Sequence, residues 1–164
     1  MEVHSQPGEG STFRIFIPTC DVEPKAEAAP LTPEPMRRGN ETILVVEDEA
    51  PLREFVIHVL QSNGYQIIAA ESGPQALERW AQNRGKIDLL LTDMVMPGGL
   101  TGRQVSERLL AEDPALKVLY SSGYSTGMAG KDVAVPKEKN FLPKPYCPTK
   151  LLEILRRCLD GPAN

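Results

Sequence analysis

The sequence has few cysteines, no excess of basic residues and no long apolar run, and each of these excludes a class of protein. Its three cysteines are odd in number and widely spaced, which fits reduced thiols better than a disulfide framework or a zinc site. A net charge of −4 provides no basic surface for nucleic acid or an anionic membrane. No apolar stretch approaches the roughly 20 residues that span a bilayer, and no secretion leader opens the chain. We therefore expect a cytoplasmic protein with no nucleic-acid partner and no membrane contact from this chain.

The pattern along the chain changes twice and divides it into three parts. Residues 1–18 end in two glycines and an alternating apolar stretch over 12–17, which is typical of a β-strand. Residues 19–40 carry four prolines among Ala, Glu, Lys and Thr, without apolar periodicity, and this composition predicts a linker. Residues 41–160 are regular and long enough for one domain, so we expect them to form the core.

Within this regular part, short apolar runs alternate with amphipathic helices. The strands are expected at 43–46, 66–70, 87–92, 116–120 and 140–143. The helices are expected around 52–60, 74–81, 105–110, 124–135 and 151–159. This alternation predicts an α/β fold with a doubly wound, five-stranded parallel sheet. Right-handed crossovers leave few arrangements, of which the strand order 2-1-3-4-5 is a common one.

The strongest strand of this predicted sheet runs straight into an aspartate, Asp93. Three successive leucines precede Thr92 and Asp93 and predict a strand covered on both faces. Pro97 and the glycines after it end the strand, because proline lacks an amide donor and glycine favours turns. In the predicted order, the strand that ends in Glu47 and Asp48 lies beside it. All three carboxylates should therefore meet at the ligand-binding edge of the sheet.

The side chains expected at this edge suit phosphoryl transfer. Three close carboxylates repel one another unless a cation lies among them, and oxygen ligands of this kind suit Mg²⁺. Lys144, after the fifth strand, could neutralise a phosphoryl oxygen, and the hydroxyl of Ser122 could donate to another. Asp93 remains as a nucleophile that could accept a phosphoryl group as an acyl phosphate.

From about Glu41 to Asp160 the chain resembles the receiver domain of response regulators in two-component signalling. The resemblance rests on four motifs in order: Glu47-Asp48, Asp93 with Met96-Pro97, Ser122-Gly123, and Lys144-Pro145. It implies a flavodoxin-like fold whose partner is a histidine kinase or a histidine phosphotransfer protein.

The resemblance also implies a role for each matched residue. Asp93 would be the phosphoacceptor, and Asp48, Asp93 and the main-chain carbonyl of Val95 would ligate Mg²⁺. Glu47 would act largely through water. Ser122 and Lys144 would hold the phosphoryl group and signal its presence. Phe141 matches the family's switch aromatic, although it also fits a plain core position.

At the other end of the chain, residues 8–18 resemble the last glycine box and final strand of a histidine-kinase ATP-binding domain. This resemblance implies the C-terminal receiver of a hybrid sensor histidine kinase. Without the kinase core, the chain would catalyse only its own phosphorylation and dephosphorylation. A lone strand buries nothing, so we expect the arm to be disordered by default, or else to pair with a second molecule in a weak homodimer.

Two other functions compete with the hybrid-kinase hypothesis. The first is a stand-alone, single-domain response regulator that binds a partner when phosphorylated. The second is a Mg²⁺-dependent phosphohydrolase with an aspartyl nucleophile. The hydrolase would need a second aspartate as general acid shortly after Asp93, where Met94 and Val95 stand.

Overall fold

The computed structural model describes residues 1–16, 38–97, 99–123 and 140–161. The chain divides into two compact units, Met1–Pro35 and Met36–Asn164. The helix expected around 124–135 lies outside the described residues. Among those that are described, no helix is both long enough and apolar enough to cross a bilayer.

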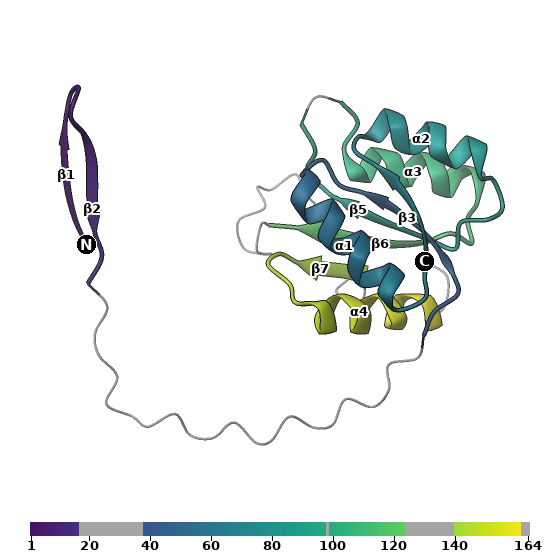
Figure 1. Cartoon of the computed structure of the whole chain (residues 1–164). Coiled ribbons are helices and arrows are strands. Elements are labelled where there is room, and N and C mark those ends of the chain that lie inside the picture. Colours follow the sequence, from purple (N-terminus) through teal and green to yellow (C-terminus); the bar gives the residue numbers. More distant parts are fainter. Residues whose placement is uncertain (17–37, 98, 124–139, 162–164) are drawn as a thin grey trace, which may run out of the picture. The chain divides into compact units, whose positions relative to one another are not determined.

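The larger unit is built on a five-stranded parallel sheet (Figure 1). Its strands are β3 (Thr42–Val46), β4 (Gln66–Ala70), β5 (Leu89–Asp93), β6 (Lys117–Ser122) and β7 (Phe141–Pro143). They lie in the order β4-β3-β5-β6-β7, which is the predicted order 2-1-3-4-5. The predicted doubly wound, flavodoxin-like α/β fold is therefore confirmed.

Four described helices cover the two faces of this sheet: α1 (Ala50–Ser62), α2 (Gly73–Gln82), α3 (Gly102–Glu112) and α4 (Pro148–Asp160) (Figure 1). The apolar side chains of α1 and α4 share one buried cluster with alternate residues of β3 and β5. Those of α2 and α3 share a second cluster with the other residues of the same strands. The central strands are thus buried on both sides, as their continuous apolar runs predict.

The helix ends follow from local sequence. Pro51 lies in the first turn of α1, where its missing amide costs no hydrogen bond. After α1, Gly64 adopts a φ of +96° that turns the chain into β4. Thr101 and Gln104 form a reciprocal capping box at the start of α3. These caps fix the loops that join helices to the ends of the strands.

The residues just before β3 are held at the end of the sheet opposite Asp93. The amide of Gly39 donates to the carbonyl of Asn63 at 3.0 Å. The carboxylate of Glu41 lies 2.7 Å from the guanidinium of Arg156 on α4. Burial raises the pKa of Glu41, but the hydrogen bond from Arg156 and further hydrogen bonds outweigh it and leave this pKa lowered. The segment that leads into β3 is therefore held against the surface of the larger unit.

The smaller unit contains an antiparallel hairpin, and this corrects two expectations. We expected one strand over 12–17 and a disordered arm; the structure instead pairs β1 (Glu2–Gln6) with β2 (Gly10–Arg14). Positive φ angles at Gly8 and Gly10 allow the reversal. The strand β1 was missed because it carries one apolar side chain and no alternating pattern.

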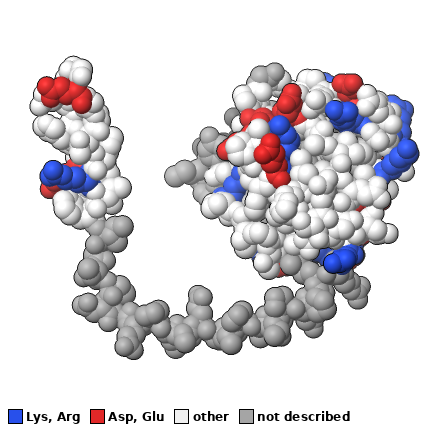
Figure 2. Space-filling view, viewed as in Figure 1, with Lys and Arg blue, Asp and Glu red and all other residues white. Residues whose placement is uncertain are grey.

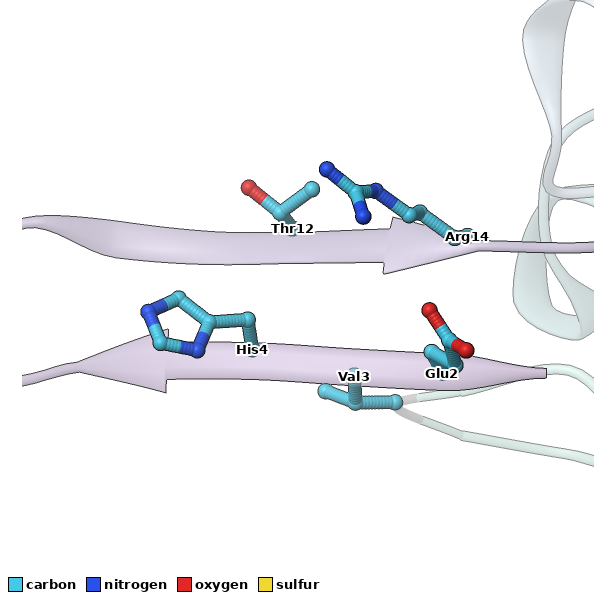
Figure 3. A pocket seen from close by; sticks show the side chains of 5 residues that line it. All are labelled: Glu2, Val3, His4, Thr12 and Arg14. Atoms are coloured by element: carbon cyan, nitrogen blue, oxygen red, sulfur yellow. The ribbon is translucent and has the colours of Figure 1, made fainter.

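The two faces of the hairpin differ in polarity. His4, Thr12 and Arg14 project from one side of the ribbon around a shallow pocket, and Val3 projects from the other (Figure 3). Val3 is paired with Phe13, and both side chains are more than half exposed. Ile15 and Phe16, directly after β2, are exposed as well.

Candidate functional site

The three carboxylates expected to converge do so at the C-terminal edge of the sheet. Glu47 and Asp48 directly follow β3, and Asp93 ends β5. One ligand atom from each residue lies within 4.8 Å of the others. On the face shown in Figure 2, acidic side chains gather at the end of the larger unit where α1 begins in Figure 1. Parallel pairing of β3 with β5 is the cause, because it places their carboxyl ends side by side.

Lys144 reaches into this cluster from the end of β7. Its Nζ lies 2.6 Å from Oδ2 of Asp93 and 2.8 Å from Oε2 of Glu47. Its main-chain amide donates to the carbonyl of Ser122 at 2.8 Å, which fixes the start of the side chain. Burial alone would lower the pKa of Lys144, but the hydrogen bonds to Asp93 and Glu47 outweigh it and raise the pKa. Lys144 is therefore a fixed positive charge between two carboxylates.

Glu47 is the most constrained acid of the cluster. Its side chain is nearly fully buried, and burial raises its pKa despite the hydrogen bond from Lys144. While Oε2 faces Lys144, Oε1 is buried and has no hydrogen-bond partner among the described residues. An orphaned carboxylate oxygen beside two further acids is a donor set that a hard divalent cation such as Mg²⁺ would satisfy. The residues present therefore fit the metal that the sequence implies.

The loop after Asp93 contacts the side chain of that residue, and the start of α3 packs on its main chain. The amide of Val95 donates to Oδ1 of Asp93 at 3.0 Å, and the Val95 side chain is exposed. At Gly102, a Cβ would lie 1.9 Å from the carbonyl oxygen of Asp93, so only glycine fits there. This close approach was not found from the sequence, where Gly102 resembled an ordinary loop glycine.

Ser122 and Phe141 lie on the two neighbouring strands at this edge. Ser122 is buried at the end of β6, beside the start of Lys144. Phe141 begins β7, is half-buried, and pairs in register with Tyr120 of β6. The structure therefore brings Ser122 next to Lys144, and places Phe141 at the start of β7, the strand that Lys144 directly follows.

Two residues near the cluster were missed by sequence reasoning. Arg53 donates from Nη1 to the carbonyl of Glu47 at 2.7 Å and to that of Asp48 at 3.3 Å. The side chain of Tyr146 is partly buried, and this burial raises the pKa of its hydroxyl to about 12. It packs against Phe55, with ring centroids 6.5 Å apart. Nothing in their spacing indicates these contacts, because Arg53 folds back past the start of α1 and Tyr146 contacts a residue that is distant in the sequence.

Comparison with known proteins assigns the class. Residues 43–156 match the family model described as the response regulator receiver domain. The chain therefore belongs to the response regulator receiver domain family of two-component signalling, with Glu47, Asp48 and Asp93 in its acidic pocket.

The chain is also similar to individual proteins of this family. It is 31% identical over 163 residues to the sensor kinase CckA of Brucella abortus (strain 2308), covering 95% of this chain but 17% of that protein. It is 32% identical over 104 residues to the response regulator receiver protein CpdR of the same organism, covering 63% of this chain and 84% of CpdR. The crystal structure of the receiver domain from the hybrid histidine kinase CckA is 33% identical, with a TM-score of 0.60. That match covers 73% of this chain and 99% of the solved chain.

Proposed function

We propose that this receiver takes a phosphoryl group onto Asp93 from a phosphohistidine of a histidine kinase or a histidine phosphotransfer protein. A carboxylate oxygen of Asp93 forms the new P–O bond while the P–N bond of the donor breaks, and the electron pair stays on the leaving imidazole nitrogen. The observation that carries the proposal is the position of Asp93 Oδ2, 2.6 Å from Lys144 in a cluster of three acids. A nucleophile, a fixed cation and a metal-ligand set occupy one edge of the sheet.

In this proposal the other residues of the edge bind rather than react. Asp48, Asp93 and the main-chain carbonyl of Val95 would hold Mg²⁺, with Glu47 contributing largely through water. The bound metal would offset charge on the phosphoryl oxygens. Lys144 and Ser122 would each hold one of those oxygens. Phe141 would change its packing when Ser122 engages the phosphoryl group.

Labelling with a small phosphodonor tests the phosphoacceptor directly. Acetyl phosphate with Mg²⁺ should add one acid-stable, base-labile phosphoryl group, visible as a mass increase in the intact protein. Asp93→Asn should abolish the increase, because the amide is no longer a nucleophile. Asp113→Asn, on the loop after α3, is a matched control and should label like the wild type. Unchanged labelling of Asp93→Asn would contradict the assignment.

We further propose that the chain is a cytoplasmic part of a hybrid sensor histidine kinase, namely its C-terminal receiver. The alignment with CckA leaves 5% of 164 residues, about eight, unmatched, so β2 and residues 19–40 fall inside it. A two-stranded hairpin is marginal on its own in water, and the apolar side chains of this one are exposed. We infer that residues 1–18 are the end of an ATP-binding domain whose remaining strands would cover Val3 and Phe13.

Amide exchange tests this inference about the arm. In the chain by itself, the hairpin should open readily, so the amides of β1 and β2 should show little protection from exchange. In a longer protein that carries the preceding domain, they should be protected. Protection of these amides in the chain alone would contradict the inference.

One observation favours the competing function, a stand-alone single-domain regulator. The receiver protein CpdR is matched over 84% of its length, so a receiver of this size can form most of a protein. That match covers only 63% of the present chain. The reading frame upstream of Met1 distinguishes the two functions: a kinase core there supports the hybrid, and a stop codon supports the stand-alone regulator.

A further inference from the structure

The side chain of Arg53 contacts the main chain of both Glu47 and Asp48, the two acids that follow β3. Arg53 is the fourth residue of α1, and its own amide donates to the carbonyl of Glu49 at 2.9 Å. The side chain, only 17% exposed, folds back past the start of the helix. From there Nη1 donates to the carbonyls of Glu47 and Asp48, at 2.7 Å and 3.3 Å.

These hydrogen bonds complete the restraint on the Glu47 peptide. The amide of Glu47 donates to the carbonyl of Ala70 at 3.2 Å, which extends the pairing of β3 with β4 by one residue. With its carbonyl held by Arg53, both main-chain groups of Glu47 are fixed. The direction in which the chain leaves the sheet, and hence the placement of both carboxylates, then depends on Arg53.

The ion pair that Arg53 makes does not explain its position. Its Nη2 lies 3.9 Å from Oε2 of Glu71, whose side chain is 64% exposed. At this distance, an ion pair with a solvent-exposed partner contributes little to stability. The guanidinium is instead directed at two carbonyls, which it can hold because its donors are arranged in a rigid planar fork.

We propose that Arg53 is a positioning residue that presets the Glu47–Asp48 main chain for Mg²⁺. Because Mg²⁺ demands near-ideal octahedral geometry at short distances, a displaced ligand loses affinity. The proposal rests on the proposed function, since it assumes that the acidic cluster binds the metal. It adds a residue that touches neither the metal nor the phosphoryl group.

Whether Mg²⁺ affinity rises or falls when Arg53 is replaced shows whether the residue acts by positioning the ligands or only by its charge. Removing a positive charge near three carboxylates should tighten Mg²⁺ binding if charge alone matters. Loss of a group that orients metal ligands should weaken it, typically 10- to 100-fold. Arg53→Gln removes a positive charge and the orienting hydrogen bonds together, so the two effects predict opposite changes in its Mg²⁺ affinity.

The experiment is a calorimetric titration of Mg²⁺ into the wild type, Arg53→Gln and a control variant. We expect the Kd of Arg53→Gln to rise about 10-fold or more. Arg108→Gln on α3 removes an exposed arginine and should bind like the wild type. Without any metal, the amides of positions 47 and 53, which donate to the carbonyls of Ala70 and Glu49, should exchange faster in Arg53→Gln than in the wild type. A Kd for Arg53→Gln equal to or below that of the wild type would overturn the proposal.

Two further measurements keep the outcomes distinct. Urea unfolding establishes whether Arg53→Gln is folded. If it is not, Arg53→Lys decides, because an ammonium cannot hold two carbonyls as a planar fork does. A weakened Kd in Arg53→Lys supports the proposal, and a wild-type Kd overturns it. If the wild type itself binds no Mg²⁺, the proposed function fails. If the wild type binds Mg²⁺ and the Arg53 variants bind it with the same Kd, this inference alone fails.

Discussion

Lys144 bridges Asp93 and Glu47, with its Nζ 2.6 Å from one carboxylate and 2.8 Å from the other. The bridge joins β7 to β5 and β3, three strands of one sheet edge. It places the positive charge of Lys144 beside Asp93, which is proposed to accept the phosphoryl group, and beside Glu47, which has the unpaired oxygen. A phosphoryl group on Asp93 would change what Lys144 binds.

Replacing Lys144 with alanine should separate metal binding from the response to phosphorylation. Mg²⁺ affinity should stay equal or increase slightly, because a competing positive charge is removed. Phosphorylation should no longer alter the amide exchange of β7 and α4, since the proposed bridge from the phosphoryl group to β7 is lost. Lys150→Ala, an exposed lysine on α4, is the control. A wild-type exchange change in Lys144→Ala would contradict this role.

Glu47→Gln should stabilise the protein at neutral pH in the absence of metal. Burial raises the pKa of Glu47, so the folded state holds a proton more tightly than the unfolded state does. The wild type therefore loses stability as pH rises from about 4.5 through the folded-state pKa. We expect a gain on the order of 1 kcal/mol at pH 7 in Glu47→Gln.

Urea unfolding as a function of pH checks the sign. Other acids titrate in the same range, so the quantity to plot is the difference in unfolding free energy between wild type and Glu47→Gln. This difference should shrink as pH falls toward 4.5. A variant that is less stable than the wild type at neutral pH would show that ionised Glu47 stabilises the fold.

Gly39→Ala should destabilise the larger unit, although Gly39 lies outside every strand and helix. A Cβ there would lie 1.9 Å from Cε1 of Tyr65, whose ring is buried. Relieving such an overlap typically costs about 1–3 kcal/mol. Gly99→Ala is a matched control, because its Cβ would meet Pro74 at an ordinary 3.7 Å. Equal unfolding free energies for the two variants would contradict the packing described at Gly39.

Two truncations should differ although their ends lie three residues apart. Deleting residues 1–37 should leave the melting temperature, Mg²⁺ affinity and phosphorylation of Asp93 unchanged. Deleting 1–40 should lower the melting temperature by several degrees, because it removes the hydrogen bond from Gly39 to Asn63. A dimer that becomes a monomer on deletion of 1–37 would show instead that the arm joins two molecules.

The strands and the acidic cluster could be predicted from patterns along the chain, whereas the strand order was one of a few arrangements and was favoured by the resemblance to receivers. Apolar runs locate the parallel strands, and the carboxyl ends of such strands share one edge, which brings Asp93 to Glu47 and Asp48. Arg53 could not be found this way, since its role depends on a side chain that folds back past a helix terminus. Gly102 was missed because its close approach to Asp93 joins residues nine positions apart.

The chemistry of Asp93 is tested most directly by locating the phosphoryl group. Borohydride reduces an aspartyl phosphate to homoserine, which tandem mass spectrometry can assign to one position. After treatment with acetyl phosphate and Mg²⁺, we expect homoserine at position 93 and at no other aspartate. Homoserine at another position, or none in a protein that has gained the phosphoryl mass, would contradict it.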